Sequence, residues 1–403
     1  MNAPKLRFKE FNDDWKKINL KSVFNYYSTN SLSREQLSNS GIIKNIHYGD
    51  IHRKFSTIVD INRHVDSFIK DLNYKNKNEL CKNYDLIFAD ASEDYEGIGK
   101  AIELINVDFN TVSGLHTILA RDVQNSFAPK FKGYYFNSPI IHNQIRVLAN
   151  GFKVYGISKE TINKLNVNIP SKNEQTKIAN TLELLDKKIE LQSKKIEDLK
   201  LLKKGLIDAE FTNSNYDEIS LKNILKERKL YSEKGLEYPH VTLSKNGIYD
   251  KEERYNRDFL VKSEDKKYKI THLNDLCYNP ANLKFGVICL NEYGSAIFSP
   301  IYVTFEINSI ANPKYIKYYT TRNNFINAIR KYEQGTVYER MAVAPEDFLK
   351  FNIKLPDIET QNKIVLKLAK LDKKILLEEN KLYKLQELKK GLMQKMFVWD
   401  LFY

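Results

Sequence analysis

Two long segments of the chain carry apolar residues at alternating spacings of four and three, with polar residues between them. In the first segment these positions are Ile178, Leu182, Leu185, Ile189, Ile196, Leu199 and Leu206. In the second they are Ile364, Leu368, Leu371, Ile375, Leu382, Leu385 and Leu392. The gaps fall at equivalent places, Gln192 and Lys203 in one and Glu378 and Lys389 in the other. Such a heptad seam predicts two helices that pack on other helices.

Each predicted helix begins after a proline. Pro170 and Pro356 precede Ser171 and Asp357, which are good N-caps, and neither segment contains an internal proline. The core of each segment, 32 residues, spans roughly 48 Å, longer than a domain of this size is wide. We therefore interpret the helices as spacers rather than as covers on their own domains. Their length corresponds to about 14 base pairs of DNA.

The seam leaves two arrangements open, since the helices either pair with each other or dock separately onto a partner's helices. We favour antiparallel pairing within the chain, because one helix leads away from the first domain and the other follows the second. Matching the seam ends Ile178 and Leu392 places Gln192 opposite Glu378. A polar pair at that point would fix the register at some cost in stability.

The two segments are also copies of one another. Gln175-Thr-Lys-Ile recurs as Gln361-Asn-Lys-Ile, and Leu185-Asp-Lys-Lys-Ile189 recurs at the same offset. The resemblance continues upstream to Pro170 and Pro356 but fades in the middles of the two halves, roughly 25–125 and 226–310. A repeated frame around different inserts suits a protein that performs one operation on two different targets.

The variable halves read as mixed α and β structure, with strands expected at 84–88, 285–289 and 301–305. The predicted fold class is α+β: two globular recognition domains joined by two long helices in an antiparallel coiled coil, with a pseudo-twofold internal repeat. The predicted boundaries are 1–168 for the first domain, 169–211 for the central helix, 212–354 for the second domain and 355–403 for the C-terminal helix.

Aromatic, hydroxyl and cationic residues cluster in three expected loops, two of which follow equivalent glycines, Gly151 and Gly335. These groups suit contacts with DNA bases and phosphates, although ordinary turn chemistry explains any single loop equally well. The candidate DNA-binding residues are Lys44, His47, Tyr48, Lys153, Tyr155, Thr336, Tyr338 and Arg340.

Composition changes this picture only modestly. The net charge of +13 favours a polyanionic partner but also fits a merely basic protein. The three cysteines are scattered, without metal or CxxC spacing, so free thiols are expected and a structural zinc is not. Neither a signal peptide nor an apolar stretch of membrane-spanning length is visible, so we expect a cytoplasmic protein.

Catalytic motifs are not recognisable. Gly97-Ile-Gly-Lys100 lacks the frame of a phosphate loop, and Asn279-Pro280-Ala-Asn only partly matches an amino-methyltransferase motif. Two alternatives to DNA reading stay open at this point. One is a nuclease using acids and a lysine, Asp85, Asp90 and Glu93 with Lys100, and the other is a coiled-coil adaptor without DNA contact.

The chain resembles the specificity subunits of bacterial type I restriction-modification systems. The resemblance is carried by the lead-in Leu6-Arg-Phe-Lys-Glu-Phe11 with Trp15, by the helix start Ile169-Pro-Ser with Glu174-Gln175-Thr-Lys-Ile178, and by the second copy ending Lys389-Lys-Gly-Leu392. The second helix departs from the pattern, with Thr360 in place of Glu174, which weakens a local cap.

The resemblance implies a non-catalytic subunit that reads a two-part site in double-stranded DNA, one half per recognition domain. It also implies two modification subunits that methylate adenine with S-adenosylmethionine, and two restriction subunits that translocate and cleave DNA with ATP and magnesium. We therefore expect no cofactor and no metal in this chain.

Overall fold

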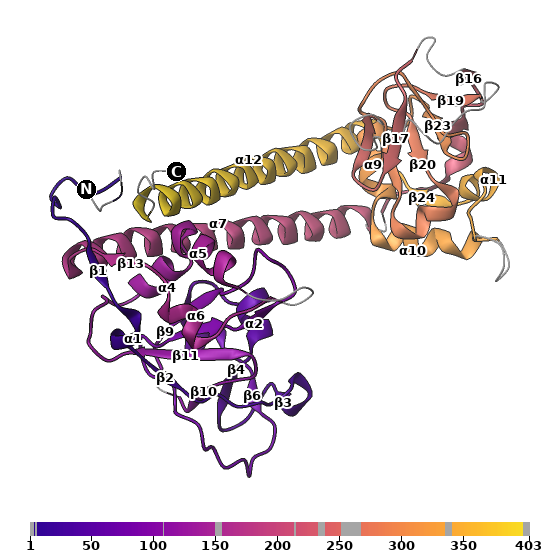
Figure 1. Cartoon of the computed structure of the whole chain (residues 1–403). Coiled ribbons are helices and arrows are strands. Elements are labelled where there is room, and N and C mark those ends of the chain that lie inside the picture. Colours follow the sequence, from indigo (N-terminus) through magenta and orange to yellow (C-terminus); the bar gives the residue numbers. More distant parts are fainter. Residues whose placement is uncertain are drawn as a thin grey trace. The chain divides into compact units, whose positions relative to one another are not determined.

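Two helices of 40 residues each, α7 (Lys172–Phe211) and α12 (Ile358–Phe397), run through the computed structural model (Figure 1). At 1.5 Å per residue each is about 60 Å long. The structure describes residues 4, 6–107, 109–149, 155–212, 215–232, 238–250, 267–334 and 341–397. The chain divides into two compact units, one formed by Met1–Ser193 with Asn380–Tyr403 and the other by Lys194–Glu379. Each unit therefore contains part of both long helices.

Unit 1 is built on a five-stranded sheet of order β2-β11-β7-β9-β5, in which only the β5–β9 pair is parallel. Its strands are β2 (Phe24–Tyr27), β5 (Ile58–Asp60), β7 (Leu86–Ala89), β9 (Ala101–Ile105) and β11 (Thr117–Asp122). A second sheet has the order β10-β4-β6-β3, with β3 (Leu37–Ser38), β4 (Lys44–Ile46), β6 (Phe68–Ile69) and β10 (Thr111–Ser113).

Short elements complete this unit. Two antiparallel pairs are formed by β1 (Lys16–Ile18) with β13 (Val167–Ile169), and by β8 (Ala91–Ser92) with β12 (Tyr155–Gly156). The helices are α1 (Leu20–Val23), η1 (Arg34–Gln36), α2 (Tyr48–Arg53), α3 (Ile61–His64), α4 (Phe131–Phe136), α5 (Pro139–Leu148) and α6 (Lys159–Asn163). Because β1 pairs with β13, the start of the domain lies beside the strand that leads into α7.

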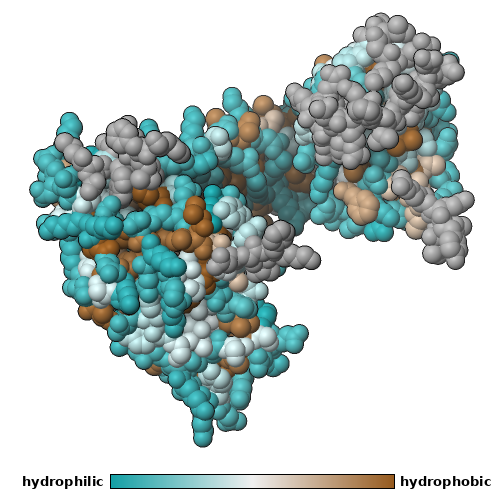
Figure 2. Space-filling view, in the orientation of Figure 1, coloured by the Kyte–Doolittle hydropathy of each residue, from teal (hydrophilic) through white to brown (hydrophobic). Residues whose placement is uncertain are grey.

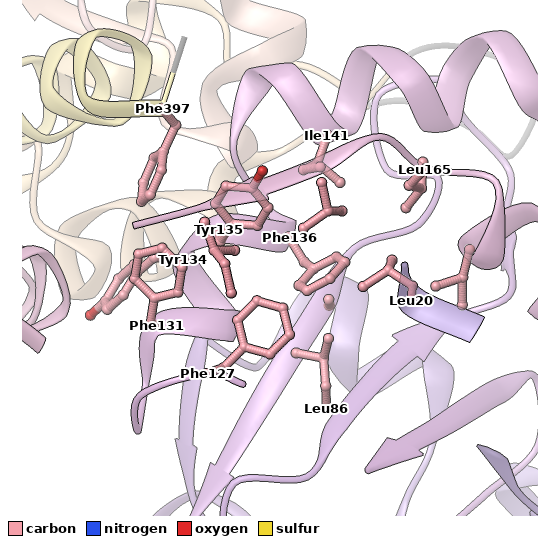
Figure 3. Packing of buried hydrophobic residues seen from close by; sticks show 14 of the residues in the cluster. Leu20, Leu86, Phe127, Phe131, Tyr134, Tyr135, Phe136, Ile141, Leu165 and Phe397 are labelled. Carbon is pink, nitrogen blue, oxygen red and sulfur yellow. The ribbon is translucent and has the colours of Figure 1, made fainter. Parts of the chain in front are cut away.

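The core of unit 1 is aromatic. Phe127, Phe131 and Phe136 pack with Tyr134 and Tyr135, all of them buried (Figure 3). Phe397, the last residue of α12, enters the same cluster, with its ring 5.6 Å from that of Tyr135 and 5.9 Å from that of Phe131. The end of α12 is thus part of the core of unit 1.

Unit 2 repeats the central sheet without the fifth strand, in the order β15-β23-β20-β21. These strands are β15 (Leu225–Glu227), β20 (Leu276–Tyr278), β21 (Ile288–Leu290) and β23 (Val303–Ile307). The remaining strands are β14 (Glu218–Ser220), β16 (Tyr231–Ser232), β17 (Val241–Ser244), β18 (Gly247–Asp250), β19 (Tyr268–Thr271), β22 (Ala296–Phe298) and β24 (Asn352–Lys354). Its described helices outside α7 and α12 are η2 (Leu221–Asn223), η3 (Pro280–Phe285), α9 (Pro313–Thr320), α10 (Asn323–Ile329), η4 (Arg330–Tyr332) and α11 (Pro345–Leu349).

The sequence repeat is a structural repeat at the level of single hydrogen bonds. Gln175 accepts from the Ala128 backbone N–H at 2.7 Å and donates to the Pro170 carbonyl at 2.9 Å. Its counterpart Gln361 accepts from the Asn312 N–H at 2.7 Å and donates to the Pro356 carbonyl at 2.8 Å. In each unit this buried amide ties the first turn of a long helix to the globular part of that unit.

A tyrosine and an aspartate repeat in the same way. The Tyr134 hydroxyl donates to Asp186 at 2.8 Å in unit 1, and the Tyr318 hydroxyl donates to Asp372 at 2.6 Å in unit 2. The last residues of the helices correspond as well. Phe211 packs in unit 2, with its ring 4.9 Å from that of Tyr315, as Phe397 does in unit 1.

Ion pairs between α7 and α12 within each unit show that the helices run antiparallel. Asp186 pairs with Lys389 at 2.5 Å in unit 1, and Lys203 pairs with Asp372 at 2.5 Å in unit 2. The predicted register placed Lys384 opposite Asp186, so the ion pair of Asp186 with Lys389 lies five residues from the expected position in unit 1. Ile178 shares its core cluster with Phe397, and its expected partner Leu392 packs against the same cluster. The expected pairing of Gln192 with Glu378 stays a prediction.

The seam residues face the interior to differing degrees. Buried side chains are Ile178, Leu182, Leu185, Ile196, Leu199, Ile364, Leu368 and Ile375. Half-buried ones are Ile189, Leu206, Leu371, Leu382, Leu385 and Leu392. Glu378, at a gap in the seam, is 5% exposed and accepts from Lys195 at 3.0 Å.

Hydrophilic side chains cover most of the face of the molecule drawn in Figure 2, and hydrophobic side chains are visible between them.

Two of the strand predictions need only shifts of a few residues, since β7 and β23 begin two residues later than expected. The third is wrong in its first half. Phe285 ends the 3-10 helix η3, and Gly286 follows with a φ of 79°, so β21 begins only at Ile288. A left-handed backbone at Gly286 breaks the apparent apolar run.

Candidate DNA interface

Lys44 and His47 occupy structural positions in unit 1, which corrects their prediction as loop residues. Lys44 lies in β4 at 6% exposed, and its ammonium donates to the Ile61 carbonyl at 2.7 Å. His47 is also 6% exposed and caps α2, with Nδ1 accepting from the Gly49 N–H at 3.1 Å. Burial lowers the pKa of His47, helped by the nearby Arg34. Because both side chains are already used inside the domain, neither is free to read a base.

Tyr48 is better placed than Lys44 and His47 to contact a ligand at the surface. It is half-buried at the first position of α2, and its ring lies among three histidine rings, with centroid distances of 4.7 Å to His47, 5.2 Å to His116 and 6.2 Å to His52. His52 Nε2 lies 2.9 Å from the Ala91 carbonyl. This set forms a polar aromatic surface at the end of β7.

His116 projects from the turn that leads into β11. Its side chain is half exposed, and Nδ1 lies 3.2 Å from the Asp90 carboxylate. The backbone φ of His116 is 54°, in the left-handed region that non-glycine residues rarely adopt. Gly114 precedes it where a Cβ would come within 2.6 Å of the Asn45 side chain, so this turn is fixed by close packing. Backbone strain of this kind concentrates at functional sites.

Tyr155 belongs to the same region. It lies in β12 opposite Ser92 of β8, and its ring centroid is 5.1 Å from that of Tyr95. The Tyr95 hydroxyl donates to the Arg146 carbonyl at 3.0 Å. Since His52 contacts Ala91 in β8, the structure brings the predicted Tyr48 and Tyr155 segments together. Lys153 lies outside the described residues.

In unit 2 the predicted residues Thr336, Tyr338 and Arg340 lie outside the described residues. The residues that flank them are described, and Gln334 and Ala342 form an antiparallel bridge with hydrogen bonds of 2.9 and 3.0 Å. The next residue, Val343, donates to the Pro280 carbonyl of η3 at 3.3 Å. The two chain ends of the predicted loop are therefore anchored beside η3, at the end of β20.

Sequence reasoning missed His52, His116 and Tyr95. A positive φ at a histidine has no sequence signature, and His116 is adjacent to Tyr48 only because β10, β11 and α2 meet. Tyr95 gave a usable signal in the sequence, because it lies within an otherwise polar and acidic run, 90–96. An exposed aromatic residue in a polar loop is unusual enough to single out.

Three of the four residues of the nuclease alternative are engaged in separate contacts. Asp85 is buried and accepts from the Arg121 guanidinium at 2.8 Å. The Lys100 ammonium donates to the carbonyls of His52 and Phe55 at 3.2 and 3.3 Å, and burial lowers its pKa. Asp90 accepts from His116. These groups do not converge on a single point, so their arrangement does not favour the nuclease alternative.

The segment that only partly matches an amino-methyltransferase motif has a structural role. Asn279 caps η3, with its side-chain oxygen accepting from the N–H groups of Ala281 and Asn282, so this segment serves as a helix cap. The three cysteines are buried free thiols. Over the described part of the chain there is no group of three metal-ligating residues placed to hold an ion. In that same part, no helix is long and apolar enough to cross a membrane.

The comparisons with known proteins address both the family and the fold. Residues 12–201 match the family model described as the type I restriction modification DNA specificity domain. The S subunit of a type I restriction-modification system from M. genitalium is 15% identical in sequence, with a TM-score of 0.58 over 99% of this chain and 100% of that one. A structure from a study of complex assembly and conformational transition in the type I R-M system is 14% identical, with a TM-score of 0.57 over 96% and 98%. No curated protein matches the chain.

The fold of the chain is that of a type I S subunit: two recognition domains, each leading into a long helix. Its first unit carries the type I restriction-modification DNA specificity domain. Residues 12–201 are accordingly a type I restriction modification DNA specificity domain, and the likeness to the solved S subunits extends over the fold of the whole chain.

Proposed function

We propose that this chain reads a two-part site in double-stranded DNA, each unit taking one half of the site. The observation that carries the proposal is the repeat. Gln175 and Gln361 make the same hydrogen bonds in the two units, whereas the surfaces at the ends of β7 and β20 differ. A protein that reads two different half-sites needs both domains to be attached to the helices in the same way, but needs a different DNA-contacting surface on each domain.

The repeat also supports two copies of a modification partner. Exposed leucines occupy equivalent places on the helices, with Leu191 at 68% and Leu388 at 51% in unit 1, and Leu377 and Leu202 both at 52% in unit 2. Exposed apolar groups on a helix favour contact with a partner. Two restriction subunits would join the same complex. S-adenosylmethionine, ATP and magnesium would be bound by these partners, so this chain would supply sequence reading and no chemistry.

The experiment is to map methylated adenines in cells that express this chain with its modification subunit, beside cells that express the modification subunit alone. We expect a motif of two short blocks with an unread gap, present only with this chain. DNA binding by the purified complex should weaken steeply with salt, because the phosphate contacts release counterions. Methylation without this chain, or salt-independent binding, would contradict the proposal.

An adaptor function without DNA contact is the remaining alternative. A mobility assay at two salt concentrations separates the two, because an adaptor leaves the affinity of the modification subunit for DNA unchanged. The specificity function predicts that the affinity rises only for duplexes that contain the mapped motif.

A further inference from the structure

The connection that follows the third strand of the central sheet holds the same place in both units. In unit 1 it runs through residues 90–100 from β7 to β9, and in unit 2 through residues 279–287 from β20 to β21. The end of β7 pairs with the start of β11 at Ala89 and Thr117, and the end of β20 pairs with the start of β23 at Tyr278 and Val303. The two connections are therefore topologically equivalent, although their sequences are unrelated.

Each connection presents an exposed aromatic ring beside a cation. Tyr95 is 43% exposed, and the guanidinium of Arg146 lies 5.5 Å from its ring centroid. Phe285 is 64% exposed, and the ammonium of Lys284 lies 5.2 Å from its ring centroid. A phenylalanine exposed to that degree contributes nothing to the core of its own unit. The fold keeps these rings at the surface in both copies.

The same connections contact described residues that border the candidate segments in the sequence. Tyr95 contacts Tyr155 of β12, which follows the Gly151 segment. Pro280 of η3 accepts from Val343, which follows the Gly335 segment. In each unit the connection thus contacts a described residue that follows a candidate segment in the sequence.

Beyond the cation beside each ring, the two connections carry different charged groups. In unit 1, Glu93 has no ion pair with any other described residue, and it can accept hydrogen bonds. In unit 2 the equivalent surface is basic, because the side chain of Lys245 lies against Gly286, with its Cε 3.6 Å from where a Cβ would stand, and Lys284 is adjacent. Carboxylates accept from the amino groups of cytosine or adenine, whereas lysines donate to guanine or to phosphates.

We infer that these two connections are equivalent DNA-contacting elements that determine specificity, with the rings of Tyr95 and Phe285 packing on thymine methyl groups or deoxyribose. Glu93 accepts from a base amino group in one half-site, while Lys245 and Lys284 donate to guanine or phosphate in the other. This inference rests on the proposed function and adds to it the residues that make the two halves read differently.

The test uses the full chain in complex with its modification subunit and compares Tyr95→Ala and Phe285→Ala with two matched controls. Tyr84 is 43% exposed and Leu273 is 58% exposed, and both precede the third strand, at its opposite end. Tyr84→Ala and Leu273→Ala remove comparable exposed side chains from the same units. Unchanged melting temperatures establish that all four variants are folded.

Binding is measured on a duplex that carries the methylated motif mapped with the unmodified chain. Tyr95→Ala and Phe285→Ala should each weaken binding about 5-fold to 150-fold, the range for loss of a base contact, and each should relax the methylated motif in one half only. The controls should bind within about 2-fold. Lys284→Ala should lower the slope of log affinity against log salt by about 1 if it holds a phosphate, or relax a guanine position if it reads a base.

Variants of Tyr95 or Phe285 that behave like the controls, in a complex that still methylates its motif, would overturn the inference and leave the proposed function standing. An effect from only one of the two would overturn the equivalence of the connections. If the unmodified chain directs no methylation and binds no motif, the proposed function itself fails.

Discussion

Phe397 offers the most direct test of how α12 is held. Its ring is fully buried at the end of the helix, within the cluster that contains Phe131 and Tyr135. Replacing it with alanine removes the whole ring and leaves a cavity lined by aromatic side chains. Truncations of this kind cost about 3–5 kcal/mol, and the rigidity of the surrounding rings favours the upper part of that range.

Unfolding of unit 1 can be followed separately from that of unit 2 with tryptophan fluorescence. The chain has two tryptophans, Trp15 and Trp399. Trp15 is 3% exposed and lies 6.5 Å from Tyr135, beside the cluster in question. In a Trp399→Phe background the urea midpoint reported by Trp15 should fall sharply in Phe397→Ala. It should fall by far less in Phe397→Leu, which keeps most of the buried apolar volume.

The control is Leu388→Ala, which removes an exposed side chain from the same helix and should change the stability by less than about 0.5 kcal/mol. A loss below about 1 kcal/mol in Phe397→Ala would refute the packing of the end of α12 in unit 1. The repeat predicts an equal loss in unit 2 from Phe211→Ala, since Phe211 is 2% exposed.

Three further predictions concern single contacts. Gln175→Ala leaves the buried Ala128 N–H and Pro170 carbonyl without their partner and should destabilise unit 1 by about 1–3 kcal/mol in urea unfolding. Asp186→Asn weakens contacts with a tyrosine and a lysine at a partly exposed site, so thermal melts should show a loss of no more than about 1 kcal/mol. Burial lowers the pKa of His47 on folding, so the folded state binds fewer protons, and the stability that His47 contributes falls as the pH drops below the unfolded pKa. Melts from pH 7 to pH 5 should therefore show a steeper loss for the unmodified chain than for a His47→Asn variant, which keeps a capping side chain.

The sequence predicted well what depends on periodicity and repetition. The apolar spacing in α7 and α12 identified both helices, and the copied Gln175 and Gln361 marked equivalent places in two similar units. Their hydrogen bonds could not be foreseen, because their partners Ala128 and Asn312 lie 47 and 49 residues upstream and reach the helices only through tertiary packing. The seam was aligned on its leucines and so left out the buried phenylalanines at the ends of the two helices, Phe211 and Phe397.

The candidate interface was predicted less well because residue type does not report burial. Lys44 has a side chain that could contact a phosphate, but its ammonium donates a hydrogen bond to the Ile61 carbonyl inside the domain. His116 and Tyr95 reach Tyr48 and Tyr155 through tertiary packing of segments distant in sequence. Only exposure, read from the structure, separates Phe285 from the many phenylalanines of the core.

The measurement that tests the central claim most directly is an exchange of halves followed by a map of methylated adenines. Residues 1–168 are replaced by the first domain of another specificity subunit whose motif has been mapped, and residues 169–403 are kept. The account predicts a motif in which one block is that of the donor and the other block is unchanged. A motif altered in both blocks, or one unchanged in both, would contradict independent reading by the two units.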